Sequence, residues 1–243
     1  MRLKLICCDV LTREICHELY ATPNTVDPIF TSKGAHEKPE YLHGLIQKEI
    51  DKADKEGCYA AVILGYGLCG NAADGLMARS IPLVIPRAHD CCTLFLGSKK
   101  KFIEYFGENP SLEWGSSGYM ERGDSYIRQT QTGKLLGIDL DYEQLVERYG
   151  EENAEFIRET LYPERPGSEL IFIDMPETSH LGYLDRMREL AEEAGKDLKT
   201  FQGDIHLIRA LLEGNWDEDE FLVVPPGKSI KAVYDQDIIM TVE

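Results

Sequence analysis

Short apolar segments alternate with helical patterns along this chain, and this alternation constrains the fold more than any other feature. The helical pattern is clearest over 39–57, where apolar residues share one face and Gly57 can end the helix. Strands that are apolar on both faces and separated by helices are typical of a parallel sheet covered on both sides. The predicted strands lie at 3–8, 59–64, 82–86, 168–175, 197–203 and 220–229.

The sequence therefore predicts an α/β fold with a mostly parallel, Rossmann-like sheet or sheets flanked by helices. The stretch 108–125, rich in Gly, Ser and Pro, predicts an irregular loop or a lobe boundary. Three predicted β-α units precede it and three follow, which leaves open two pseudo-repeated lobes, 1–110 and 111–243, or one continuous domain. Beyond the loop, helices are predicted over 142–150 and 151–162.

The charge and hydropathy of the chain limit the classes of partner that we expect it to bind. The formal net charge is −17, with 43 acidic and 26 basic residues, and such a surface repels phosphate backbones, so we do not expect nucleic acid as a partner. We see neither a secretory signal nor an apolar stretch of membrane-spanning length, and we expect a cytoplasmic protein that does not bind membranes. In that compartment the seven cysteines stay as thiols, and their spacing fits neither a disulfide framework nor a zinc ribbon.

Cysteines stand at three predicted strand-to-helix junctions, where open α/β sheets bind ligands. Cys8 lies in "CCDVLTRE", Cys69 in "GYGLCGNAADG" and Cys91 in "RAHDCC". Neighbouring strand residues point to opposite faces, so only one of Cys7 and Cys8 can face a shared site. We expect Cys8, Cys69 and Cys91 to converge on a metal, with His89 as a fourth ligand or proton carrier. Thiolates bind both iron–sulfur clusters and zinc, so the metal stays open, as does simple packing of the cysteines in the core.

The loop "GYGLCGN" is predicted to line a ligand. Gly65, Gly67 and Gly70 permit close backbone approach, and successive amides there can hold an anionic or amide-bearing molecule beside Asn71. A helix is expected to start after this turn, within 65–79.

The third junction supplies candidate catalytic residues. Arg87 can hold a carboxylate or phosphate with two hydrogen bonds, and His89 can move protons beside Asp90. Elsewhere, "DIHLIR" contains the D-x-H of a cobalamin-binding motif, but Arg209 stands where that motif needs glycine. We therefore do not expect cobalamin to bind directly through His206.

Three stretches, "ICCDVLTREI", "GYGLCGNAADGL" and "PRAHDCCTLFLGSK", resemble an uncharacterised domain-of-unknown-function family of methanogens and other anaerobes. Its members carry the cysteines matched here by Cys8 and Cys69 and the His-Asp-Cys matched by residues 89–91. A family tryptophan resembles Trp114, although "LEWGSSGYMERGDS" departs from the family's Pro-Gly-Trp type of sequence. The family is often associated with corrinoid-dependent methyltransferase systems, and the resemblance implies an anaerobic one-carbon context.

Three functions follow as expectations. The first is a metal-centre protein, iron–sulfur or zinc, in anaerobic one-carbon or corrinoid-linked methyl metabolism, with a metal-dependent transferase or lyase activity left open. The second is a metal-free enzyme in which Cys69 or Cys91, activated by His89, attacks a small anionic substrate. The third is a non-enzymatic accessory or cofactor carrier that docks on a corrinoid or methyltransferase protein through its acidic surface.

Overall fold

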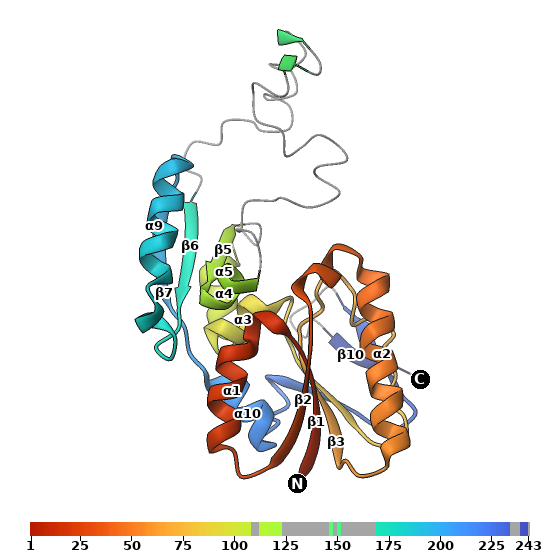
Figure 1. Cartoon of the computed structure of the whole chain (residues 1–243). Helices are drawn as coiled ribbons and strands as arrows, with labels where there is room; N and C mark the ends of the chain where they lie inside the picture. The colour runs from red at the N-terminus through yellow and green to blue at the C-terminus, as the bar shows by residue number, and fades with distance from the viewer. Residues whose placement is uncertain (108–111, 123–145, 148–149, 152–168, 234–238, 243) are drawn as a thin grey trace.

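The computed structural model describes residues 1–107, 112–122, 146–147, 150–151, 169–233 and 239–242. In this part the chain forms a five-stranded, a three-stranded and a two-stranded sheet (Figure 1). The prediction of an α/β fold with a mostly parallel sheet flanked by helices is confirmed. The helices predicted over 142–150 and 151–162 lie outside the described residues, apart from 146–147 and 150–151.

The five-stranded sheet has the order β2-β1-β3-β4-β8, with four parallel strands and β8 antiparallel to β4. After β2 the chain crosses to the other side of β1, so the strand order reverses between β1 and β3. In open α/β sheets ligands bind outside the carboxyl ends of the strands at such a reversal. The strands are β1 (Arg2–Cys8), β2 (Thr25–Thr31), β3 (Ala61–Gly65), β4 (Leu83–Pro86) and β8 (Phe221–Val224).

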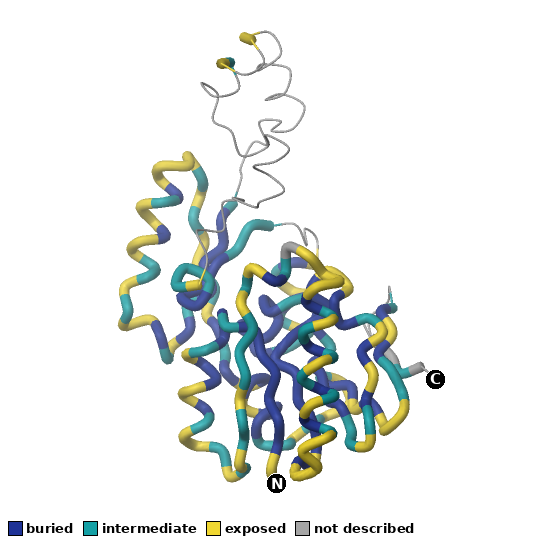
Figure 2. The backbone as a smooth tube through the Cα atoms, turned by 45° about the vertical axis from the view of Figure 1, so that its right-hand side comes forward, coloured by how far each residue is buried: buried dark blue, intermediate teal, exposed yellow. Residues whose placement is uncertain are grey.

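Helices cover both faces of this sheet. α1 (Thr12–Ala21) and α10 (His206–Glu213) lie on one face, and α2 (Pro39–Glu56) lies on the other (Figure 1). The strands between them are buried, while the outer sides of the helices are exposed (Figure 2). Short elements follow the strands at their carboxyl ends: η1 (Asp9–Leu11), η2 (Lys33–Glu37), α3 (Cys91–Leu96) and α4 (Lys99–Phe106).

The three-stranded sheet is parallel, in the order β5-β6-β7. Leu170 and Phe172 pack with Met187 and Ala191 in a small core of their own, which joins β6 to α9. Its elements are β5 (Glu113–Ser116), α5 (Ser117–Arg122), β6 (Glu169–Asp174), η3 (Ser179–Leu181), α9 (Tyr183–Glu193) and β7 (Asp197–Gln202). The last two strands, β9 (Ser229–Ala232) and β10 (Ile239–Val242), pair antiparallel.

Several details differ from the sequence expectations. β2 was not predicted, because Pro28 interrupts its pattern; the strand tolerates proline because it is the edge of the sheet. The irregular loop predicted over 108–125 contains β5 and α5 in its described part. The pseudo-repeat is not confirmed, since β8 comes from the second predicted region and joins the sheet of the first.

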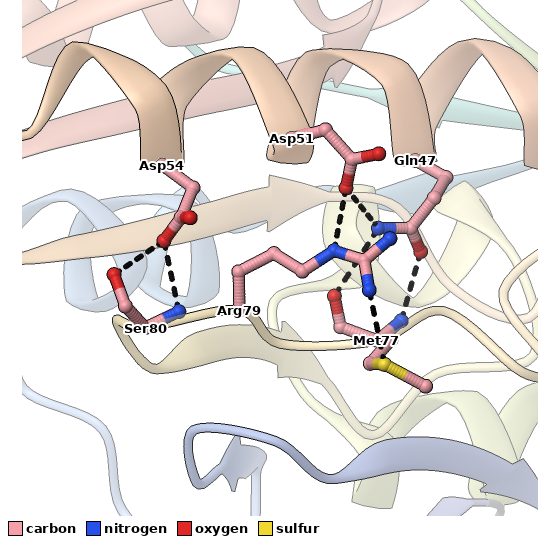
Figure 3. A network of polar contacts seen from close by, with 6 residues as sticks. All are labelled: Gln47, Asp51, Asp54, Met77, Arg79 and Ser80. Atoms are coloured by element: carbon pink, nitrogen blue, oxygen red, sulfur yellow. Dashed lines mark hydrogen bonds and ion pairs between the residues drawn. The ribbon is translucent and has the colours of Figure 1, made fainter.

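Side chains on one face of α2 fix the segment that leads into β4 (Figure 3). The Gln47 amide binds both backbone groups of Met77, donating to its oxygen at 3.3 Å and accepting from its nitrogen at 2.9 Å. Asp51 accepts from Arg79 Nε at 2.6 Å, and Asp54 accepts from the backbone of residue 80 at 2.8 Å. Together with the antiparallel bridge between Met77 and Ser229, these contacts fix the far end of the loop that follows β3.

Candidate metal centre

The three predicted metal-ligating cysteines lie at the carboxyl ends of three adjacent strands. Cys8 ends β1, Cys69 lies in the loop after β3, and Cys91 begins α3 after β4. The loops after β3 and β4 run side by side, because the backbone nitrogens of Leu68 and Cys69 donate to the oxygens of Ala88 and His89, both at 2.9 Å. This pairing prolongs the sheet beyond its last residues and brings Cys69 toward Cys91.

The thiols are buried and influence one another. Cys8, Cys69 and Cys91 are 1%, 7% and 2% exposed. Burial raises the pKa of Cys91 well above its usual value, and negative charge on Cys69, Asp90 or Cys8 raises it further. Burial likewise raises the pKa of Cys69, to which Asp90 and Cys8 add. The three sulfurs therefore lie within electrostatic reach of each other, and each is a neutral thiol at neutral pH in the absence of a cation.

Burial raises the pKa of Cys8 to about 12, with the backbone N–H of Val10 and the charge of Lys33 acting in the opposite direction. Cys8 Sγ lies 4.0 Å from Asp9 Oδ1. Cys7 instead packs beneath Gly65, where an added Cβ would lie 2.4 Å from its sulfur. As the strand geometry requires, the two neighbouring cysteines have different surroundings, and Gly65 is a packing position.

As the side chains lie, the thiols do not form a ligand set. Among the described residues no three His, Cys, Asp or Glu side chains are grouped closely enough to hold a metal ion. Cys91 Sγ is hydrogen-bonded at 2.9 Å to the hydroxyl of Tyr119, which comes from α5 beside the second sheet. Tyr119 packs edge-on against Trp114 and Phe95, so the hydroxyl that bonds Cys91 belongs to a cluster of three aromatic side chains. Metal binding requires the cysteine side chains to turn from these positions.

The loop after β3 has an unusual backbone. Cys69, Gly70 and Asn71 have φ angles of 48°, 66° and 69°, so three successive residues are left-handed. A non-glycine residue in this conformation costs about 1–2 kcal/mol. The helix predicted to start within 65–79 is not formed, because left-handed residues cannot enter a right-handed helix. A Cβ on Gly67 would lie 2.7 Å from Ala88 O, so glycine is required there for the two loops to pair.

The candidate catalytic residues of the third junction make different contacts. Burial raises the pKa of Asp90, although the charge of His89 still lowers it. The Arg87 Nε donates to the backbone oxygen of Glu218 at 2.9 Å. His89 is exposed, with its ring centroid 5.8 Å from that of Phe102. Asp90 caps α3 by accepting from Cys92 N at 2.9 Å. Of the three, Asp90 lies nearest to the thiols, since it affects the pKa of Cys69 and Cys91.

The structure adds residues that sequence reasoning missed. Tyr66 lies within electrostatic reach of Cys8 and Cys69, and its hydroxyl bonds Thr31 at the end of β2. Lys33 Nζ lies 4.6 Å from the ring centroid of Tyr119. Tyr66 lies inside the glycine-rich loop and could have been chosen from that position alone. Lys33 follows a strand that the sequence did not predict, so its nearness to the site could not be foreseen.

Gly118 sets the contact between α5 and η1. An added Cβ would lie 1.7 Å from the oxygen of Val10, so we expect Gly118→Ala to lower the free energy of unfolding by about 1–3 kcal/mol. The same change at Gly44, inside α2 with open space around it, should raise stability by up to about 1 kcal/mol. Urea unfolding of both variants tests this, and equal effects would contradict the close packing of α5.

Comparison with known proteins gives a family. A family model described as "Protein of unknown function (DUF1638)" matches residues 30–212, well over half of the chain. The match includes Cys69 and Cys91 and begins after Cys8. We found no curated protein and no solved structure that matches the chain. Within the described residues, no helix combines the length and apolar character needed to cross a membrane. On the extent of the family match, the chain belongs to the DUF1638 family.

Proposed function

We propose that this protein binds a metal centre, an iron–sulfur cluster or zinc, through Cys8, Cys69 and Cys91. The observation that carries the proposal is the burial of three thiols at one edge of the sheet, within electrostatic reach of each other, where the strand order reverses. Thiolates are the ligands that both kinds of centre share. The left-handed backbone at Cys69 supports a functional role, because strained backbone is concentrated at such sites.

The ionisation of the thiols favours a metal over a metal-free nucleophile. A nucleophilic cysteine needs a lowered pKa and partial exposure, whereas Cys91 is buried with a raised pKa. His89 is the base that such a mechanism would use, and its exposed ring packs against Phe102. A bound cation would supply the positive charge that stabilises thiolates, since a coordinating metal deprotonates its thiol ligands outright.

The proposed setting is anaerobic one-carbon or corrinoid-linked methyl metabolism in the cytoplasm. The family resemblance supports this setting, as do the seven cysteines, all of which are free thiols. We further propose that the loop of Gly67, Gly70 and Asn71, with Arg87, receives a small anionic or amide-bearing ligand. A corrinoid or methyltransferase protein is the proposed partner, and the net charge of −17 argues against nucleic acid.

Metal analysis of protein purified without oxygen tests the proposal. We expect stoichiometric iron with sulfide and a brown colour, or one zinc per chain in colourless protein. Titration with Zn²⁺ should also release protons, because three protonated thiols become thiolates. Protein that contains neither metal and binds neither after anaerobic reconstitution would overturn the proposal.

A further inference from the structure

A second histidine, His36, lies at the carboxyl edge of the central sheet. It is the fourth residue of η2, which follows β2 directly. Its Nε2 is buried and has no hydrogen-bond partner among the residues that the structure describes. An imidazole nitrogen without a partner in a buried position is costly, because it loses its bond to water without replacement. Such an atom needs an explanation, and a bound ligand is one.

The surroundings of His36 connect it to the thiol site. Its ring centroid lies 6.0 Å from that of Tyr66, whose phenol is within electrostatic reach of Cys8 and Cys69. A second connection runs through Asp9, whose Oδ1 lies 4.0 Å from Cys8 Sγ and accepts from Lys33 N at 2.9 Å. Lys33 begins the 3₁₀ turn in which His36 stands, and residues three apart in such a turn are stacked on one side.

The strand order places these groups along one edge of the sheet, although, as the described side chains lie, no three of them are grouped closely enough to hold a metal ion. β2, β1, β3 and β4 are consecutive in the sheet and parallel, so their carboxyl ends lie along one edge. This edge carries, in order, His36, Cys8, Cys69 and Cys91. His89, which stands two residues before Cys91, is exposed instead and packs against Phe102. One side chain per strand thus supplies a potential donor atom.

We propose that His36, through Nε2, is the nitrogen ligand of the metal centre and makes it a four-ligand Cys3His zinc site. The inference rests on the proposed function, because it requires the three cysteines to bind metal. It goes further by choosing the metal and by filling the fourth position from η2. Three thiolates with one imidazole form a closed, tetrahedral arrangement that zinc adopts in proteins.

X-ray absorption on the zinc-loaded wild-type protein tests the ligand set without a substitution. We expect three sulfurs at about 2.3 Å and one nitrogen at about 2.0 Å. His36→Ala should lose the nitrogen contribution, keep the sulfurs, and weaken Zn²⁺ binding by at least about 100-fold, more than the loss of an outer residue does. His89→Ala is the matched control and should leave both measurements unchanged. Imidazole NMR of the wild type adds a readout that does not depend on variant folding, since only His36 should shift strongly on adding Zn²⁺.

The outcomes separate this inference from the proposed function. Wild-type protein that binds zinc through three sulfurs, with the nitrogen retained in His36→Ala or lost in His89→Ala, would overturn the role of His36 alone. A four-sulfur site or an iron–sulfur cluster as the bound centre would do the same. Wild-type protein that binds neither zinc nor a cluster would overturn the metal centre itself.

Discussion

The substitutions Cys69→Ser and Cys91→Ser are each expected to weaken metal binding by more than about 100-fold relative to wild type, because each removes a thiolate ligand. Serine has nearly the shape of cysteine, but its hydroxyl does not ionise at neutral pH and is a poor ligand for soft metals. The unusual backbone at position 69 is equally accessible to either residue, so the fold should be retained. Competition with a chromophoric chelator measures the affinity, and circular dichroism checks the fold.

Cys92 is the matched control. It is the next residue to Cys91 and is fully buried, but burial and Asp90 alone account for its raised pKa, with no contribution from the other thiols. Cys92→Ala should therefore lower stability through lost packing and leave metal affinity within about threefold of wild type, a difference of less than about 1 kcal/mol. Cys16→Ser, at an exposed thiol, should change neither. A loss of affinity in Cys92→Ala as large as in Cys91→Ser would contradict the proposed ligand set.

The sequence could predict that the cysteines lie at the carboxyl edge of the sheet, because this prediction needs only the residues next to each one. Each lies immediately after a continuous apolar strand, and parallel strands bring their carboxyl ends to one edge. The same rule could not show that the strands of Cys8, Cys69 and Cys91 are neighbours; the strand order β1-β3-β4 settles that. Nor could it show the present side-chain positions, in which the thiols are near each other without forming a ligand set.

Two other parts of the site depend on contacts that no local pattern reports. His36 belongs to the site only because β2 is a strand, and Pro28 hides that strand from any propensity argument. Tyr119 reaches Cys91 from α5, within a stretch whose Gly and Ser content indicates a loop. Gly118 does not mark a loop in this stretch; it is needed because only glycine permits the close contact between α5 and η1. Tertiary packing, rather than local conformational preference, therefore determines the positions of His36 and Tyr119.

The stability of the fold should also depend on a single buried carboxyl group. Glu14 in α1 is 0% exposed, and neither of its oxygens has a hydrogen-bond partner within the described part of the chain. Burial raises its pKa from 4.5 to about 7; the backbone N–H of Glu14 itself acts in the opposite direction, and the nearby charges of Glu177 and Glu121 raise the pKa further. The folded state therefore holds this proton more tightly than the unfolded state does.

The contribution of Glu14 to the free energy of unfolding therefore decreases as pH rises. Below pH 4.5 Glu14 is protonated in both states and contributes nothing; as pH rises from 4.5 to about 7, only the unfolded state releases the proton, so stability falls. Above about pH 7 both states are ionised, and the folded state is destabilised by about 3 kcal/mol. Glu14→Gln removes this proton equilibrium while keeping the shape of the side chain. We therefore expect wild type to lose about 2.5 kcal/mol more unfolding free energy than the variant between about pH 5 and about pH 8.

Glu18, one turn further along α1, provides a control of opposite sign. It accepts from Arg209 Nε at 2.8 Å and from Nη2 at 3.2 Å, and these bonds hold its pKa below the usual value. Its contribution to stability is present above its unfolded pKa and is lost as pH falls through the folded one, so Glu18→Gln should destabilise the protein at about pH 8 and have little effect in acid. Urea titrations of both variants across this range decide the matter. Parallel pH profiles for Glu14→Gln and wild type would mean that the Glu14 carboxyl is solvated or paired in solution, and the burial argument for it would fail.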